Sequence, residues 1–235
     1  MPFPFIMLLA LLMGCAGREI MVEKVIDGDT VELGNGTRIR LAGINTPERD
    51  EPCYWQARGA LETLAGGKKA GVRALGKDKY GRTLGEVYIG GENINIKMLE
   101  FGLANRYYSE GVDWAQYSRA EQKGRSAGGC MWERDEVYAC IAVKRSNAGF
   151  EVRNGCNVTI DTPVIIRDTS ASHRFKRHLY LGPYESVSIT EGCNEKNGTI
   201  ALCQNIFNYN GDEVFIINEK SGKLVGWAAY GIYGG

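Results

Sequence analysis

Histidine is nearly absent from this chain of 235 residues. The only two, His173 and His178, lie in the last third, so the first 172 residues contain none. Without histidine, that stretch can form no Ser-His-Asp triad, no HExxH zinc site and no histidine-activated nuclease metal site. Any catalytic site there must use other side chains.

The chain also has no excess of charge of one sign and no closely spaced cysteines. Lys plus Arg and Asp plus Glu each number 28, so no overall field attracts a polyanion and any nucleic-acid site must be local. No two of the seven cysteines are close enough for a CxxC zinc or redox motif, which favours disulfides.

A long hydrophobic run is missing as well. The longest one near the start, residues 5–13, is far shorter than the ~20 residues of a membrane-spanning helix. Residues 1–17 carry no charge and favour a signal-peptide core, with a buried N-terminal strand as the alternative. The run ends in LMGC at Cys15, which resembles the lipobox of exported lipoproteins. The sequence therefore predicts an exported protein, either secreted or lipid-anchored through Cys15 to the outer face of the cell membrane.

The composition and the hydrophobic patterns predict two globular domains. Hydrophobic residues make up 44% and charged residues 24%, which excludes a disordered, collagen-like or coiled-coil chain. The hydrophobic pattern over residues 18–134 predicts an α+β domain in which a small barrel is followed by helices. The predicted strands are 18–26, 30–33, 37–44, 69–76 and 83–89, and the predicted helices are 55–65, 95–104 and 117–128. Residues 135–235 contain short apolar runs separated by glycine, asparagine and proline, which is typical of an all-β sandwich.

Three short segments of the first half contain side chains suited to catalysis. They are residues 26–30 (IDGDT), 40–48 (RLAGINTPE) and 78–82 (DKYGR). Taken singly, each suits a tight turn, a helix N-terminus or a hairpin. Together they supply oxygen ligands, a further carboxylate and two arginines, which is the inventory for metal-assisted phosphodiester hydrolysis.

In order, spacing and strand context, these segments resemble the staphylococcal nuclease (thermonuclease) family over roughly residues 22–134. The resemblance implies an OB-type five-stranded barrel with three helices. It also implies a calcium site in which Asp29 is a direct ligand, Asn45 takes the place of a second carboxylate ligand and Thr46 offers its backbone carbonyl. Asp27 would support this site without direct contact to the metal.

The same resemblance implies that Glu48 is the general base that orients the attacking water, and that Arg40 and Arg82 grip the scissile phosphate. These roles suit the residue types, because guanidinium groups match phosphate bidentately and a carboxylate can deprotonate a metal-bound water. The family usually has aspartate where this chain has Asn45. A neutral amide should hold calcium less tightly, so Asn45→Asp is expected to lower the calcium requirement.

Basic and aromatic residues suggest how nucleic acid is bound. Residues 68–82 form a local positive track for the phosphate backbone. Lys79 lies in it, and Tyr80 and Tyr108 are candidates for stacking on sugar or base, with core or surface packing as the alternative for both.

Residues 138–230 resemble, more weakly, the lamin-tail type of immunoglobulin-like sandwich, through 155–157 (GCN), 181–189 (LGPYESVSI) and 212–216 (DEVFI). We assign this half no chemistry. A basic cluster within it either touches phosphate or lipid headgroups or forms a solvated loop; its members are Arg174, Lys176, Arg177 and His178.

Six cysteines follow Cys15 and allow fifteen pairings. If each bridge stays within one domain, the pairings Cys53–Cys130, Cys140–Cys156 and Cys193–Cys203 are favoured.

The sequence as a whole predicts an exported, monomeric, Ca²⁺-dependent endonuclease that cleaves DNA and RNA, and the resemblance implies products with 3′-phosphates. One alternative is a non-catalytic nucleic-acid-binding OB module on a cell-surface protein. Another is a structural or adhesion module.

Overall fold

The computed structural model describes residues 19–147, 149–170, 173–194, 198–208 and 210–233. The predicted signal segment and its lipobox residue Cys15 lie outside the described residues. None of the helices in the described ranges is both long and apolar enough to cross a membrane.

The first half contains a closed barrel. Its strands follow the order β3-β2-β1-β5-β6-β7, and a parallel pairing of β3 with β6 closes five of them into a ring, with only the short β7 outside it. The predicted strands are confirmed, although the one predicted over 37–44 ends at Leu41, and each of the five contributes apolar side chains to the core of the barrel. The strands are β1 (Ile20–Val25), β2 (Thr30–Leu33), β3 (Arg38–Leu41), β5 (Lys69–Lys77), β6 (Thr83–Ile89) and β7 (Glu92–Asn93).

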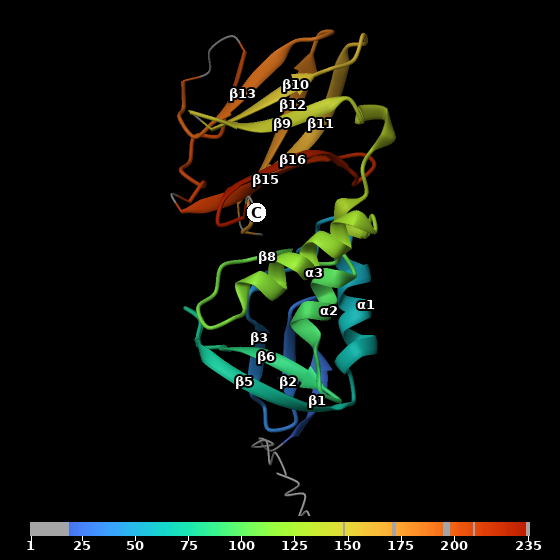
Figure 1. Ribbon diagram of the computed structural model, residues 1–235, viewed down its shortest axis with the longest axis vertical. Coiled ribbons are helices and arrows are strands. Elements are labelled where there is room, and N and C mark those ends of the chain that lie inside the picture. The colour runs from blue at the N-terminus through green and yellow to red at the C-terminus, as the bar shows by residue number, and fades with distance from the viewer. Residues whose placement is uncertain (1–18, 148, 171–172, 195–197, 209, 234–235) are drawn as a thin grey trace, which may run out of the picture.

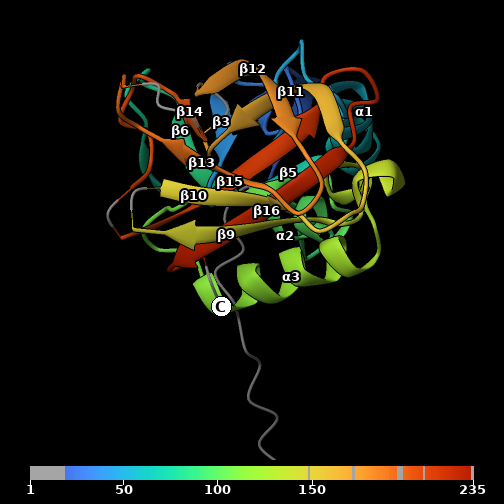
Figure 2. The same ribbon diagram turned by 90° about the horizontal axis from the view of Figure 1, so that it is seen from above.

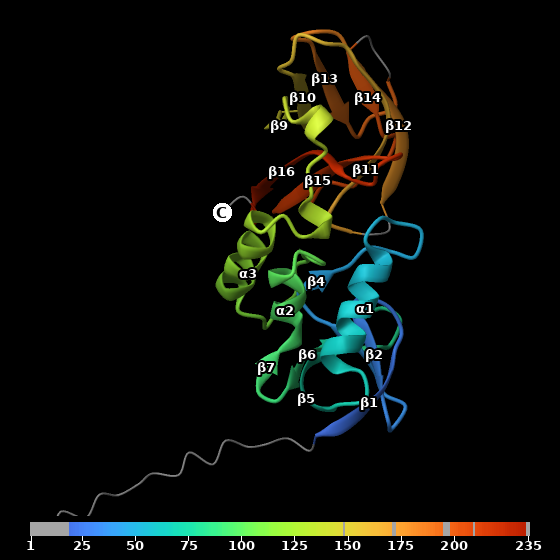
Figure 3. The ribbon, with the colours of Figure 1, turned by 90° about the vertical axis from the view of Figure 1, so that its right-hand side faces the viewer.

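Three helices cover the barrel, as predicted (Figure 1). They are α1 (Tyr54–Ala65), α2 (Ile94–Glu100) and α3 (Trp114–Ser126). Helix α1 buries residues spaced three and four apart and ends before Gly66, while α3 begins three residues earlier than predicted because the side chain of Asp113 accepts a hydrogen bond from Gln116 N (3.0 Å). A small sheet of β4 (Ile44–Asn45) and β8 (Asn105–Arg106) lies between the helices and the second half (Figure 3).

The second half is β-rich and consists of two four-stranded sheets that share one hydrophobic core. It follows two short 3₁₀ turns, Cys130–Trp132 and Glu136–Tyr138. One sheet has the order β14-β13-β10-β9 and the other β12-β11-β15-β16. The strands are β9 (Ile141–Ser146), β10 (Gly149–Asn154), β11 (Ile160–Arg167), β12 (Arg174–Leu181), β13 (Ser186–Thr190), β14 (Thr199–Ala201), β15 (Gly211–Asn218) and β16 (Leu224–Gly231).

The basic cluster of the second half lies on β12, so the solvated-loop interpretation is wrong. Exposed residues alternate with less exposed ones along this strand, and each exposed basic side chain has an acidic partner. These pairs are Arg174 with Asp50, Lys176 with Glu219 and His178 with Asp161. The partners offset much of the positive charge that the sequence alone suggested for this stretch.

Two of the three predicted disulfides are confirmed, and one is wrong. Cys53–Cys130 has a Cα–Cα distance of 5.9 Å and Cys140–Cys156 one of 5.5 Å. Cys193 is exposed and not disulfide-bonded, so the bridge to Cys203 is not formed. Economy within a domain does not ensure the close approach and converging Cβ atoms that a bridge needs.

The two halves are in contact through charged side chains. Arg106 of β8 is 1% exposed, forms an ion pair with Glu121 (2.8 Å) and donates to Tyr233 O (3.0 Å). Arg125 of α3 pairs with Glu213 of β15 (3.2 Å). Seen from above in Figure 2, the sheets of the second half overlie the barrel and leave α1 and α3 visible at the edge. This arrangement brings Thr169, two residues after β11, into contact with Asn45 of β4.

Candidate active site

A cleft of about 420 Å³ brings together every predicted site residue except Thr46. The predicted residues that line it are Asp27, Asp29, Arg40, Asn45, Glu48, Lys79, Tyr80, Arg82 and Tyr108. Residues outside the predicted set also line it, among them Asp78, Tyr107 and Ser170. Ser170 comes from the second half, so both halves contribute to the walls of the cleft.

The barrel topology explains this convergence. Asp27 and Asp29 lie in the turn before β2, whose Thr30 pairs with Arg40 on β3. Arg82 directly precedes β6, which pairs with β3 on its other side. Gly28 allows the turn to approach the next segment closely, since a Cβ there would lie 2.6 Å from Thr46 Oγ1.

Asp29 is buried and held by several donors. Its Oδ2 accepts from both the backbone N and the Oγ1 of Thr46 (3.1 Å each), and its Oδ1 accepts from Thr30 Oγ1 (3.2 Å). The structure thus shows Thr46 holding Asp29 in place. The predicted role of the Thr46 carbonyl as a metal ligand stays a prediction.

The Arg40 guanidinium lies between the two predicted ligands. Its Nη2 is 3.0 Å from Asp29 Oδ2 and also donates to Asn45 Oδ1. Its Nη1 donates to the carbonyls of Leu41 (2.6 Å) and Ile44 (2.8 Å). A positive charge therefore occupies the space between these oxygens.

The side chain of Asn45 is oriented by the second half. Its Nδ2 donates to Thr169 O (2.7 Å), so its Oδ1 faces Arg40. The opposite amide orientation would place two acceptors together at Thr169 and two donors together at Arg40. No sequence pattern indicates this contact, because the partners are 124 residues apart.

Two carboxyl groups of the cleft have raised pKa values. Burial, with the negative charge of Asp29 as the next contribution, raises the pKa of Asp27 to about 6. Burial also raises the pKa of Glu48, and Asp29 and Glu51 add to this effect, while Arg174 and Arg40 oppose it. Perturbed carboxyl groups in a cleft are a mark of functional sites.

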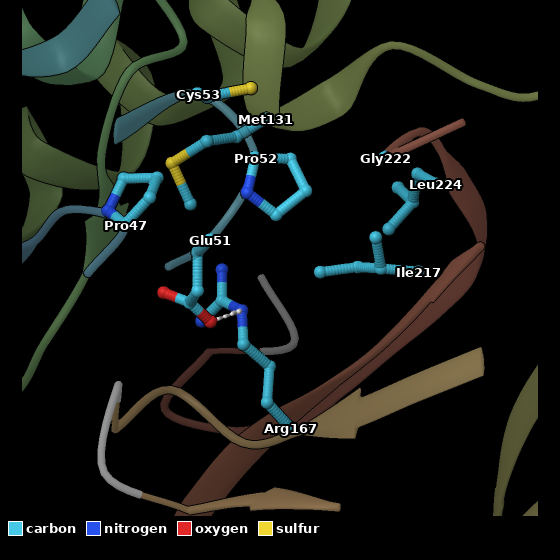
Figure 4. A pocket seen from close by; sticks show the side chains of 9 residues that line it. All are labelled: Pro47, Glu51, Pro52, Cys53, Met131, Arg167, Ile217, Gly222 and Leu224. Carbon is cyan, nitrogen blue, oxygen red and sulfur yellow. Dashed lines mark ion pairs between the residues drawn. The ribbon is translucent and has the colours of Figure 1, made fainter. Parts of the chain in front are cut away.

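Glu51 supports the backbone at Glu48. Its Oε2 accepts from Glu48 N (2.7 Å), and its Oε1 lies 3.7 Å from Arg167 Nε at the end of β11. Figure 4 shows the Glu51 carboxylate and the Arg167 guanidinium facing each other beside a small cavity between the halves. Glu51 is not among the predicted site residues, although its position three residues after Glu48 is typical of a capping carboxylate.

Arg82 and the aromatic residues form another part of the cleft. Arg82 Nε donates to Asp78 Oδ2 (2.6 Å), and its guanidinium carbon is 5.5 Å from the Tyr80 ring centroid. Lys79 Nζ is 5.1 Å from the same centroid. Tyr80 is 73% exposed and Tyr108 57% exposed, so neither packs in the core.

The donor set of the cleft fits a hard cation. Among the described residues, no group of three or more His, Cys, Asp or Glu side chains is placed to hold a metal ion. Asp29 and Asn45 nevertheless present hard oxygen atoms to one cationic position, which Arg40 takes in the structure. Burial and, after it, the negative charge of Asp29 raise the pKa of the nearby Asp27 carboxyl group. Oxygen donors of this kind suit calcium. A site with so few charged ligands is expected to bind the ion with modest affinity.

Comparison with known proteins covers the first half. Residues 38–134 match the family model described as staphylococcal nuclease homologue, which implies an OB-type barrel. The chain is similar to an uncharacterized 38.1 kDa protein of Capnoides sempervirens, with 37% identity over 111 residues, 46% of this chain and 32% of that protein. It is also similar to an uncharacterized endonuclease of Haemophilus influenzae, with 33% identity over 115 residues, 47% of this chain and 64% of that protein.

A thermonuclease of Staphylococcus intermedius is 31% identical over 131 residues, which are 50% of this chain and 78% of that enzyme. The chain therefore spans a third to two thirds of the first two relatives and more of the thermonuclease. The family match ends at residue 134, so it gives no information on the second half.

Proposed function

The chain belongs to the staphylococcal nuclease family, and from this premise we propose that it is a calcium-dependent endonuclease that hydrolyses phosphodiester bonds of DNA and RNA. The observation that carries the proposal is the convergence of the predicted base, the two arginines and the oxygen donors on one cleft. A non-catalytic nucleic-acid-binding module would not require Glu48 and both arginines to face the same cleft.

Asp29 and Asn45 would hold the calcium ion, with the carbonyl of Thr46 as a further ligand and Asp27 acting without direct contact. Bound calcium would act as a Lewis acid on a phosphoryl oxygen and make water a better nucleophile. The hydrogen-bond donors of Thr30 and Thr46 keep the Asp29 carboxylate in place.

Glu48 would hold the attacking water and accept its proton. Its raised pKa makes it a stronger base than an ordinary glutamate. Arg40 and Arg82 would stabilise the extra negative charge of the transition state, since guanidinium groups bind phosphate oxygens in pairs. Lys79, Tyr80 and Tyr108 would contact the nucleic acid around the cleft.

We further propose that the protein acts outside the cell as a monomer, with Cys15 as its lipid anchor, and that the second half is a lamin-tail-like domain without chemistry of its own. Replacement of Cys15 by Ser tests the anchor. The variant should no longer partition into detergent, whereas a mature protein that begins at another residue would contradict lipidation.

The test of the proposed activity is strand scission by the purified chain. End-labelled DNA and RNA oligonucleotides are incubated with CaCl₂ or with chelator in excess. We expect cleavage in calcium, none in chelator, and products with 3′-phosphates. Intact substrate under both conditions would contradict the proposal.

A further inference from the structure

We propose that the β11–β12 connection of the second half, through the backbone carbonyl of Thr169, positions the Asn45 amide so that its oxygen faces the cation site. The second half is then a structural part of the active site. This inference rests on the proposed function for its catalytic meaning, but the geometry on which it stands does not depend on it.

The first observation is the shared acceptor at Thr169. Its carbonyl accepts from Asn45 Nδ2 (2.7 Å) and from Asn105 Nδ2 (3.3 Å), and these two asparagines face each other in the β4–β8 pair. All three residues are buried. A carbonyl only accepts, so it selects the amine end of Asn45 and leaves the oxygen to the cleft.

The second observation is that the Thr169 backbone is itself fixed. Its N (3.2 Å) and its Oγ1 (2.8 Å) both donate to Asp212 Oδ1. Asp212 is fully buried in β15 and accepts from Asn208 with its other carboxylate oxygen. The position of the carbonyl is therefore set by the sheet of the second half.

Two further contacts join the second half to the same active-site segment, residues 45–51. Arg167 lies 3.7 Å from Glu51, whose other oxygen accepts from Glu48 N (2.7 Å). Arg174 Nη1 pairs with Asp50 Oδ1 (2.6 Å). The segment that contains the proposed base and a proposed ligand thus contacts the second half at three points, one of which is visible in Figure 4.

This arrangement accounts for asparagine at position 45. An ionised aspartate there would place a carboxylate oxygen against the Thr169 carbonyl, with no proton between two acceptors. The gain in ligand charge would be offset by loss of the contact that orients the side chain. We therefore expect Asn45→Asp to weaken calcium binding, which is the opposite of the expectation from sequence alone.

A double-mutant cycle in the full chain tests the inference, with calcium chloride affinity measured by calorimetry. Thr169→Val removes the hydroxyl that helps to hold the carbonyl in place. The matched control is Thr162→Val, at a buried threonine within β11. We expect Thr169→Val to weaken calcium binding about tenfold, as loss of a ligand-orienting partner does. We expect no weakening from the same change in the Asn45→Asp background, and none from Thr162→Val.

The inference would be overturned if Thr169→Val weakened calcium binding equally in both backgrounds, or in neither. It would also be overturned if Asn45→Asp alone bound calcium more tightly than the wild type. A metal-free measurement separates its failure from failure of the proposed function. The side-chain amide protons of Asn45 should exchange slowly with solvent in the wild type and faster in Thr169→Val, whereas exposed Asn35 stays unchanged. If the Asn45 amide exchanges as fast as that of Asn35 in the wild type, the inference is wrong, even if calcium-dependent cleavage is observed.

Discussion

At the scale of single residues, carboxylate and guanidinium groups pair with each other in the cleft. Arg40 offsets Asp29, and Arg82 is aligned by Asp78 and the face of Tyr80. The fixed geometry of Arg82 matters because a guanidinium group binds phosphate through two parallel donors, whereas lysine presents a single point charge. Shape as well as charge should therefore be required at this position.

Arg82→Lys tests this requirement. The variant keeps the positive charge but loses the paired donors and the Asp78 Oδ2 contact at 2.6 Å. We expect kcat to fall about 10²-fold, in the range seen for loss of one transition-state donor. Arg38→Lys on β3, at an exposed arginine that pairs with Glu32, should leave kcat unchanged. Unchanged turnover in Arg82→Lys would exclude the proposed phosphate contact.

The raised pKa of Asp27 predicts how the stability of the protein depends on pH. Its pKa is raised from 3.8 to about 6, so the folded state binds a proton that the unfolded state has lost between these values. Ionisation of Asp27 therefore reduces stability as the pH rises through this window. Asp27→Asn removes the charge, while its side-chain oxygen can still accept from Asp29 N (3.1 Å in the wild type).

In chelator at pH 7–8, the unfolding free energy of Asp27→Asn should exceed that of the wild type by on the order of 2 kcal/mol, so the variant should unfold at a higher temperature. The difference should shrink as the pH approaches 4. Thermal unfolding across this range is the measurement, with the exposed Glu23→Gln as control. A variant that is no more stable than the wild type at pH 8 would show that Asp27 is not destabilised by its surroundings.

At the scale of elements, the Cys53–Cys130 disulfide ties the start of α1 to the turn after α3. The bridge closes a loop of 77 residues, against 16 for Cys140–Cys156. Cys53 lies two residues after the active-site segment 45–51, which contains Glu48 and Glu51. The larger loop should contribute more to stability, because it restricts the unfolded chain more.

Replacing Cys53 and Cys130 together by serine should cost about 4.5 kcal/mol of unfolding free energy, and replacing Cys140 and Cys156 about 3 kcal/mol. Urea unfolding of the two variants measures the difference. The first variant should also cleave more slowly, while the second keeps wild-type turnover. The reverse order of stabilities would contradict this account of the two bridges.

Local patterns predicted most of these elements. The alternation over residues 37–44 predicts β3, and apolar spacing predicts all three helices. Strand β12 was missed because its exposed positions are charged and leave no apolar run. The Asn45–Thr169 and Glu51–Arg167 contacts could not be predicted either, since they depend on how two separately patterned halves meet.

At the scale of the whole molecule, a buried ionic network joins the halves. Arg106 and Arg125 lie against Glu121 and Glu213, and burial raises the pKa of Glu213. The Arg125 guanidinium is also 4.8 Å from the Trp132 ring centroid and 4.3 Å from that of Trp227. Because removing one member would leave buried charge without a partner, the halves should unfold as one cooperative unit.

Arg125→Ala should therefore lower stability by about 3–5 kcal/mol, as loss of one partner of a buried ion pair does. Scanning calorimetry should show one transition for the wild type. Arg119→Ala, at an exposed arginine on the same helix, is the control and should change stability little. Two separate transitions in the wild type, or an Arg125 variant as stable as the control, would show that the halves are energetically independent.

The most direct test of the account is to measure binding and cleavage of one oligonucleotide by the wild type and by Glu48→Gln in calcium. Glutamine keeps the shape of Glu48 but cannot accept a proton from water. We predict that the variant binds the oligonucleotide as tightly as the wild type and cleaves it at least about 10²-fold more slowly. Cleavage at the wild-type rate by Glu48→Gln would contradict the assignment of Glu48 as the base and of this cleft as the catalytic site.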